Sequence, residues 1–287
     1  MLQRSTIQLL RFPFSIFLTP VYFFALSQVP DIDWPRAALV FILLHLLVYP
    51  ASNGYNSYMD RDASPVGGIA HPLQPTRELF YVTMGMDLMA ILLSLLISPW
   101  FCGAILAYIL ASRAYSYRGI RLKRFPVFGY LTVILFQGGL TYWMVYHGCS
   151  SSLSAPTSQL PVLTACLLIG GFYPLTQVYQ HDADRADGVL TISARLGYRG
   201  TFIFCGVMYT LAMALMGYYF WTLNKMRDFF ILATMLMPVA LYFVTWARKV
   251  WRDEQQANFN NTMRMNIVAS LCTSIAFLFL LTWRYFE

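Results

Sequence analysis

The stretch "AALVFILLHLLVYPASNGYNSYMDRDASP", residues 37–65, places an apolar run directly before a polar segment that contains two aspartates. The run is continuous, and it is long enough for the roughly 20 helical residues that cross a bilayer. A strand of an outer-membrane barrel would instead alternate between apolar and polar residues over about ten positions. The stretch therefore predicts a transmembrane helix whose end carries carboxylate and amide groups.

Similar apolar runs recur along the whole chain. Its 287 residues are 58% hydrophobic and only 11% charged, whereas an average soluble domain has roughly 25% charged residues. We predict nine transmembrane helices, near residues 12–29, 36–55, 79–98, 100–117, 126–147, 160–180, 201–222, 229–247 and 265–283. The expected fold is all-α: a polytopic membrane bundle of nine transmembrane helices that forms one domain over residues 1–287.

The basic residues are divided unequally between the two ends of these helices. With nine helices and an internal N-terminus, the outer side holds only four of the 20 Lys and Arg residues, namely Arg36, Lys225, Arg227 and Arg284. Lysine and arginine are enriched in cytoplasmic loops, so this bias predicts the orientation. We expect an integral protein of the bacterial cytoplasmic membrane, with its polar loops on the cytoplasmic side. No small-residue cleavage site follows the first run, which favours a retained helix over a signal peptide.

Charge and cysteine content exclude two other classes of function. The net charge of +7 follows from the membrane orientation, so we expect no nucleic-acid partner. The five cysteines are scattered without a CxxC pair, and this spacing predicts neither a disulfide framework nor a zinc site.

Two polar stripes have the same spacing and fall on the same side of the membrane. Asn53, Asn56 and Asp60 stand at i, i+3 and i+7, so on a continuing helix they share one face. The spacing recurs at the end of the sixth predicted helix, in Gln177, Gln180 and Asp184. Helix-end residues are often simply solvated at the interface. Two matched stripes instead favour a hard cation held by oxygen ligands, with coordination positions left for a substrate phosphate, as Mg²⁺ is usually bound.

The segment "YSYRGIRLKRFPVFG", residues 115–129, follows the fourth predicted helix and is strongly basic. Its cations are Arg118, Arg121, Lys123 and Arg124. They either serve only the positive-inside bias, or one or two of them point inward and bind phosphate oxygens. Asp87, deep in the third predicted helix, has no partner identifiable from the sequence. It is either a buried hydrogen-bonded group or part of a cavity.

With these motifs the chain resembles the UbiA superfamily of intramembrane prenyltransferases over nearly its whole length. In the first motif of that family Asn56 and Asp60 match, whereas Ser57 and Ser64 stand where aspartates are common. In the second motif Asp184 matches, Gln180 replaces an aspartate, and Gln177 occupies a position that is often acidic. Arg61 directly after the first motif is also family-like, and His71 in "AHPLQ" takes the place of a frequent arginine.

The resemblance implies an all-helical bundle that uses Mg²⁺ to move a polyprenyl group from its diphosphate to an acceptor, usually an aromatic one. It implies Asp60 and Asp184 as catalytic carboxylates. The expected metal ligands are Asn56, Asp60, Gln180 and Asp184, with Asp62, Asp182 and Asp187 as candidate substitutes for the missing acids. The residues expected to bind substrate are Arg11, Asn53, Arg61, His71, Tyr115, Arg121, Lys123 and Gln177.

The expected function is transfer of a polyprenyl group, within the membrane lipid, from a prenyl diphosphate to an aromatic or quinone-precursor acceptor. Two alternatives stay open at this point. One is a UbiA-like terpene cyclase or a transferase with a non-aromatic acceptor. The other is a lipid-binding or transport protein whose polar stripes line a path. A transporter would more often show internally repeated halves with broken helices, whereas the similarity here is local to the two stripes. The oligomeric state is left open.

Overall fold

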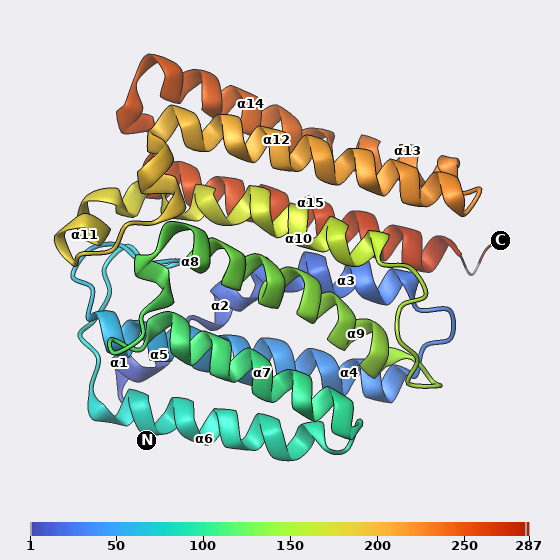
Figure 1. The fold of residues 1–287 in the computed structure, drawn as a ribbon, viewed down its shortest axis with the longest axis horizontal. Helices are drawn as coiled ribbons and strands as arrows, with labels where there is room; N and C mark the ends of the chain where they lie inside the picture. The colour runs from blue at the N-terminus through green and yellow to red at the C-terminus, as the bar shows by residue number, and fades with distance from the viewer. Residues whose placement is uncertain (1, 285, 287) are drawn as a thin grey trace.

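The apolar runs fold into long helices that lie side by side (Figure 1). The structure is a computed structural model that describes residues 2–284 and 286. Within these residues the chain is helical and contains no strand. This architecture is expected in lipid, because a helix satisfies all its main-chain hydrogen bonds within one segment. The predicted all-α bundle is therefore confirmed.

All the secondary-structure elements of the described residues are helices. The α-helices are α1 (Arg4–Leu9), α2 (Phe12–Ser15), α3 (Thr19–Gln28), α4 (Trp34–Ile42), α5 (Tyr49–Asp60), α6 (Arg77–Ser94), α7 (Pro99–Ser116), α8 (Pro126–Val133), α9 (Thr141–Cys149), α10 (Leu160–Phe172), α11 (His181–Ala186), α12 (Ile192–Thr222), α13 (Met226–Met235), α14 (Met237–Arg252) and α15 (Phe259–Trp283). Four segments of other helical types line the polar cavity described below: the 3₁₀ helices η1 (Ile16–Leu18), η3 (Leu122–Arg124) and η5 (Tyr173–Gln180), and the π-helix η4 (Ile134–Leu140).

Helices distant in the sequence are neighbours in the bundle. The N-terminal helix α3 packs against α15 and α9, while α5, α6 and α7 pack against one another. On the opposite flank α10 packs along α12, and α14 packs along α15. In Figure 1, α6 forms one edge and α12 with α14 the other, with α3, α9 and α10 between them. The end of α5, the start of α8 and α11 all lie at one end of the bundle.

By length and composition, six stretches within the described residues could cross a membrane: Arg4–Gln28, Trp34–Asp60, Pro126–Cys149, Leu160–Ala186, Ile192–Thr222 and Phe259–Trp283. The pair α13 and α14, bent by 45°, makes a seventh if counted as one span. Helices α6 and α7, which correspond to the remaining two predicted spans, are 18 residues each and are not among these. The predicted number of nine thus stays a prediction.

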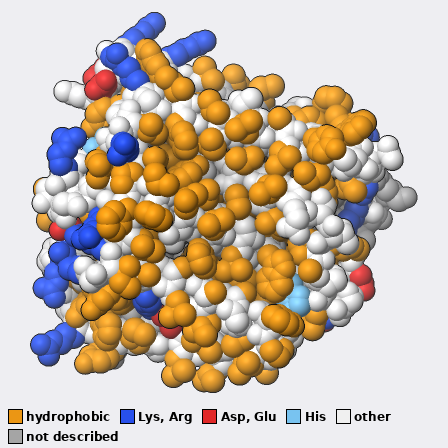
Figure 2. All heavy atoms as spheres, viewed as in Figure 1, with side chains coloured by type: hydrophobic (Ala, Val, Ile, Leu, Met, Phe, Trp, Pro, Cys, Tyr) orange, Lys and Arg blue, Asp and Glu red, His pale blue; other side chains and the backbone are white. Residues whose placement is uncertain are grey.

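The outer surface agrees with a lipid environment. Figure 2 shows one face of the bundle covered largely by hydrophobic side chains. Lysine and arginine side chains gather at the left edge of that view, which is the end that carries α11 in Figure 1. Apolar side chains such as Leu96, Trp100 and Leu241 are 62–77% exposed, as is expected where lipid rather than water is the solvent.

Candidate active site

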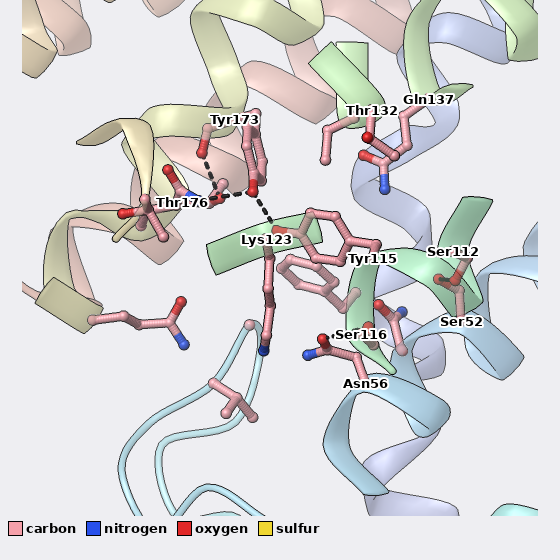
Figure 3. A pocket seen from close by; sticks show the side chains of 18 of the residues that line it. Ser52, Asn56, Ser112, Tyr115, Ser116, Lys123, Thr132, Gln137, Tyr173 and Thr176 are labelled. Atoms are coloured by element: carbon pink, nitrogen blue, oxygen red, sulfur yellow. Dashed lines mark hydrogen bonds between the residues drawn. The ribbon is translucent and has the colours of Figure 1, made fainter. Parts of the chain in front are cut away.

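A polar cavity of about 210 Å³ lies at the end of the bundle where α5 ends. It is walled by α5, α7, η4, η5, α11 and the basic segment before α8. The predicted site residues that line it are Arg11, Asn53, Asn56, Asp60, Asp62, Tyr115, Lys123, Gln177, Gln180 and Asp184. Figure 3 shows Lys123 reaching into the middle of the cavity below Tyr173, with Asn56 to one side. The fold thus brings both polar stripes and part of the basic segment to one place.

The first stripe lies on α5, which continues as a regular helix to Asp60, so the predicted shared face exists. Neighbouring elements hold its amide-bearing residues. The Ser116 hydroxyl on α7 donates a 2.8 Å hydrogen bond to Oδ1 of Asn56. The Arg11 guanidinium donates a 2.8 Å bond to the main-chain carbonyl of Asn53.

Asp60 lies at the floor of the cavity, and its side chain is only 4% exposed. Its Oδ2 accepts a hydrogen bond from the Lys123 ammonium, and Nη2 of Arg121 lies 3.5 Å from its Oδ1. Oδ1 is buried and has no hydrogen-bond partner. A buried carboxylate is costly unless it is paired, and here two cations compensate it while one oxygen is left for a ligand.

The second stripe does not lie on a regular α-helix, and the sequence prediction was wrong on this point. Residues up to Gln180 form the 3₁₀ helix η5, and Asp184 follows on α11. Gln177 and Gln180 still share a face, because side chains three apart are eclipsed in a 3₁₀ helix. The Gln177 amide donates a 2.8 Å hydrogen bond to the Tyr173 hydroxyl, and its Oε1 is buried without a partner. The Gln180 amide donates to the carbonyl of Pro65 at 3.3 Å.

The three candidate substitute carboxylates occupy different surroundings. Asp62 lines the cavity. Burial raises the pKa of the Asp62 carboxyl, and the nearby negative charge of Asp60 raises it further. Asp187 lies outside the lining and forms an ion pair with Arg121. The Asp182 side chain is 93% exposed and lies 3.9 Å from Arg185, so it points away from the site.

The basic segment divides in the same way. Lys123 lines the cavity and Arg121 is 8% exposed directly behind Asp60, whereas Arg124 is exposed and lies over the ring of Phe125. Arg118 is half-exposed and donates a 2.8 Å hydrogen bond to the carbonyl of Met59 at the end of α5. Lys123 and Arg121 therefore lie at the cavity or directly behind it, whereas Arg118 and Arg124 lie at the protein surface.

Arg61 and His71, which we expected to bind substrate, lie outside the cavity lining and are exposed. The Arg61 guanidinium lies over the Tyr58 ring, 6.0 Å from its centroid. The His71 main-chain carbonyl accepts a 3.2 Å hydrogen bond from Gln8. The assignment of these two residues to the substrate does not agree with their positions.

Two of the site arginines have an unusual backbone. Arg11 and Arg121 both have positive φ angles, of 52° each, in the left-handed region that residues with a Cβ rarely adopt. Such strain costs of order 1 kcal/mol or more and persists where the surrounding structure requires it. At both positions the chain turns between two helical segments. The Arg121 guanidinium reaches Asp60 and Asp187, and that of Arg11 reaches the main-chain carbonyl of Asn53.

Several lining residues were not among those predicted from the sequence. They are Phe14, Phe17, Ser52, Tyr108, Ser112, Ser116, Gln137, Tyr173, Thr176 and Tyr179. Tyr173 stands four residues before Gln177, and its hydroxyl is hydrogen-bonded to that of Tyr115, so the helical period is a signal that would have found it. Gln137 lies on the π-helix η4. No regular helical period would have predicted its direction.

A second, apolar cavity of about 770 Å³ adjoins the polar one. It lies among α3, α10, α12, α13, α14 and α15. Phe17, Ile169 and Phe172 line both cavities. A ligand with a polar head and a long apolar tail would therefore meet matching surfaces in these two neighbouring spaces.

The oxygen-rich lining fits a hard divalent cation. The carboxylates of Asp60, Asp62 and Asp184 and the amide oxygens of Gln177 and Gln180 are ligands that Mg²⁺ prefers. Buried oxygens without a partner occur on Asp60 and Gln177. Nowhere in residues 2–284 and 286 are three or more His, Cys, Asp or Glu side chains assembled as a closed metal-binding group. Where Mg²⁺ binds together with a phosphate substrate, it commonly takes part of its coordination from that phosphate.

Comparison with known proteins connects this geometry to a family. The sequence matches the model of the UbiA prenyltransferase family over residues 15–268. It is 29% identical over 176 residues to the bacteriochlorophyll synthase 33 kDa chain of Cereibacter sphaeroides, a match that covers 58% of this chain. The chain spans 57% of the length of that relative.

The fold is similar to solved structures of UbiA homologues. The structure of the homologue from Archaeoglobus fulgidus bound to DMAPP and Mg²⁺ has a TM-score of 0.73 at 16% identity, over 97% of this chain and 99% of that one. The apo structure of the homologue from Aeropyrum pernix K1 has a TM-score of 0.70 at 17% identity, over 93% and 98% of the two chains. At this level of identity the likeness establishes the fold.

Proposed function

This chain belongs to the UbiA prenyltransferase family, and from that premise we propose that it transfers a polyprenyl group from a prenyl diphosphate to an aromatic or other lipophilic acceptor in the membrane. The observation that carries the proposal is the pair of adjoining cavities. One gathers acids and buried cations, and the other is almost wholly apolar. A prenyl diphosphate has the same division between a charged head and a hydrocarbon tail.

The diphosphate would be bound by Lys123, Arg11 and Arg121, the buried or lining cations of the site. Lysine acts on phosphate as a point charge and arginine as a planar fork of donors. We expect these groups to stabilise negative charge as it moves onto the departing diphosphate. Such preorganised groups are often the largest contribution to catalysis.

Mg²⁺ would be held by Asp62, Asp184 and the unpartnered Oδ1 of Asp60, with amide oxygens of Gln177 and Gln180 nearby, while Oδ2 of Asp60 keeps Lys123 in place. When bound, the ion would supply positive charge to the diphosphate oxygens. This assignment leaves Asp182 and Asp187 without a direct role in holding the ion. Ser64 and Gln180 stand where the family has acids. Under this assignment Asp62, two residues after Asp60, supplies a carboxylate in their place.

Aromatic residues would surround the allylic carbon once its bond to oxygen weakens. Tyr115, Tyr173 and Tyr108 line the cavity, as do Phe14 and Phe136. Ring faces attract cations, and this attraction is stronger where water is excluded. The acceptor carbon would then attack the prenyl carbon and lose a proton.

The proposal is tested with protein purified in detergent, MgCl₂, and geranyl or geranylgeranyl diphosphate, with a phenol or a quinol as acceptor. We expect diphosphate release, and a product whose mass has increased by one prenyl group. EDTA should abolish both. A cyclic hydrocarbon formed from the diphosphate alone would identify a cyclase. Absence of diphosphate release with every substrate would contradict enzymatic transfer and favour a lipid-binding role.

We further propose that Arg121 and Lys123 contribute more than Arg118 and Arg124, because only the first two reach the buried acids. Steady-state kinetics of the four alanine variants tests this ranking. We expect kcat/KM to fall about 100-fold or more for the first two variants, as for other single groups that stabilise transition-state charge. The other two should stay within about threefold of wild type. Small and equal effects of all four variants would mean that these residues serve only to orient the protein in the membrane.

A further inference from the structure

An ion pair lies among the helices of the bundle and outside the cavities. Asp87 on α6 accepts a 2.9 Å hydrogen bond from Nε of Arg113 on α7, and Nη2 of Arg113 contacts the same carboxylate oxygen. The two side chains are 6% and 14% exposed. Neither residue lines the polar cavity or the apolar one. The mechanism proposed above therefore gives this pair no direct role.

The guanidinium has a third partner on α5. Cζ of Arg113 lies 3.9 Å from the centroid of the Tyr55 ring, and Tyr55 is only 6% exposed. The cation is thus held between a carboxylate on α6 and a ring on α5. Tyr55 directly precedes Asn56, so this contact lies at the start of the first polar motif.

Further contacts between α5 and α7 lie on both sides of the stacked pair. Three residues before Tyr55 and one before Arg113, the hydroxyls of Ser52 and Ser112 are 2.6 Å apart. Four residues further along each helix, Ser116 donates to Asn56 at 2.8 Å. These contacts match successive turns of the two helices, and they determine which residue of α5 faces which residue of α7. Asp60 is one helical turn beyond Asn56, so its position depends on the same register.

Stability alone does not account for an ion pair at this place. Charged groups among membrane helices are expensive to bury, and well-packed apolar side chains of similar volume often replace a buried pair with no loss of stability. The contacts of Arg113 are directional: two guanidinium nitrogens lie on one carboxylate oxygen and a ring lies against the guanidinium, so an axial shift of α5 or α7 would disrupt them.

We propose that Asp87, Arg113 and Tyr55 form a positioning clamp that sets the axial position of α5 and thereby the positions of Asn56 and Asp60 in the cavity. The kinetic part of its test rests on the proposed prenyl transfer. None of the three residues is expected to touch the substrate. A displacement of about 1 Å in a reacting group can cost about 100-fold in rate, so even a small shift of α5 would be measurable.

The first test is a double variant, Asp87→Leu with Arg113→Met, which removes both charges at similar volume. We expect a thermal midpoint close to that of wild type, but at least a tenfold higher Mg²⁺ concentration for half-maximal diphosphate release and a kcat lowered by about tenfold or more. Arg199→Met with Glu254→Leu is the matched control. It removes an exposed ion pair, with 3.4 Å between Nε of Arg199 and Oε1 of Glu254, and neither residue lines the site. Its kinetics should equal those of wild type.

A second pair of variants does not disturb the charges. Tyr55→Phe keeps the ring under the guanidinium and should behave as wild type. Tyr55→Leu removes the ring and should reproduce the kinetic defect of the double variant. If Tyr55→Leu is folded and has wild-type kinetics, the clamp is refuted, even where the double variant fails to fold.

The third measurement reads the register of α5 directly and needs no catalysis. With cysteines placed at Ser52 and Ser112 in a cysteine-free background, oxidation should join α5 to α7 rapidly, because the native hydroxyls are 2.6 Å apart. Introducing Tyr55→Leu or the double replacement should slow this cross-linking severalfold. Unchanged cross-linking would overturn the clamp whatever the kinetics. If wild type releases no diphosphate, the transfer proposal fails, and the cross-linking rate alone decides on the clamp.

Discussion

Asp62 and Asp182 differ in surroundings more than their sequence positions suggest. Each stands two residues from a family-matched aspartate, Asp60 or Asp184. Asp62 lines the polar cavity, whereas the Asp182 side chain is 93% exposed at the surface of α11. At the scale of single residues, the direction of a carboxylate is therefore better evidence for a role in the site than its place in an acidic motif.

These two aspartates provide a matched pair of variants. We expect Asp62→Asn to lower kcat/KM by about 100-fold, comparable to Asp184→Asn, because each removes a charge from the oxygen ligands proposed for the ion. Asp182→Asn should stay within about twofold of wild type. Diphosphate release at saturating Mg²⁺ measures all three. Equal losses from Asp62→Asn and Asp182→Asn would contradict the assignment of Asp62.

The raised pKa of Asp62 predicts how metal binding depends on pH. Burial is the main cause of this shift, so the carboxyl stays protonated to a higher pH than an exposed aspartic acid and cannot bind a cation until it loses its proton. The Mg²⁺ concentration for half-maximal activity should therefore fall as pH rises toward the pKa of Asp62, by up to about tenfold per pH unit for one proton released.

Titrations of Mg²⁺ at several pH values test this expectation, with Asp62→Asn as the control variant. The variant should need more Mg²⁺ at neutral pH and should show a shallower dependence on pH. The same slope in both proteins would mean that another group releases the proton.

At the scale of the elements, several of the irregular helices lie at the site. The π-helix η4 carries Gln137 and Phe136, and the 3₁₀ helix η5 carries Gln177 and Gln180. Short stretches of π- and 3₁₀-helix often mark functional positions, because they change the direction of side chains within an otherwise regular helix. The cavity is lined at these breaks by side chains that a uniform α-helix would direct elsewhere.

Gly138 on η4 shows how closely this break is packed. A Cβ atom there would lie 2.8 Å from Cα of Cys166 and 2.9 Å from the carbonyl oxygen of Ala165. These are main-chain atoms of α10, which cannot move as a flexible side chain does. We expect Gly138→Ala to lower the free energy of unfolding by about 1–3 kcal/mol, the usual effect of overpacking.

The comparison variant is Gly85→Ala on α6, where a Cβ would meet no atom within 4 Å. Since alanine is the better helix former by up to about 1 kcal/mol, this variant should be as stable as wild type or more stable. Thermal unfolding in detergent compares the two. A Gly138→Ala variant as stable as Gly85→Ala would show that α10 yields without cost.

At the scale of the whole molecule, the site lies at one end of the bundle and not midway along it. The end of α5, the start of α8 and α11 come together at that end, where lysine and arginine side chains also gather in Figure 2. The apolar cavity among α3, α10, α12 and α15 adjoins the polar one. A lipid substrate would thus have its head at the membrane surface and its tail within the bundle.

This arrangement predicts that the segments containing Asp60, Arg121 and Asp184 all face the cytoplasm. Single cysteines at neighbouring positions, in a cysteine-free background, should react with a membrane-impermeant reagent only from the cytoplasmic side. A cysteine at Ser151, in the predicted outer loop, should react from the opposite side. Labelling of any of the three site segments together with Ser151 would contradict the shared orientation.

Local properties of the sequence predicted the fold class and many of the residues that line the site. Continuous apolar runs require helices in lipid, and the spacing of the two polar stripes, with the resemblance that they carry, identified the family that the comparisons confirm. Ten of the predicted site residues line the cavity. For Asn53, Asn56 and Asp60 this follows from the face of α5 that local spacing determines.

Only the tertiary structure decided which charges meet. Asp87 has its partner 26 positions away, on the next helix, and Arg121 reaches Asp60 and Asp187 through a left-handed turn. Asp62 and Asp182 diverge because a side chain's direction after a helix end depends on main-chain angles that no periodicity specifies. Pairings of this kind depend on how helices pack against one another, and packing is a property of the assembled bundle.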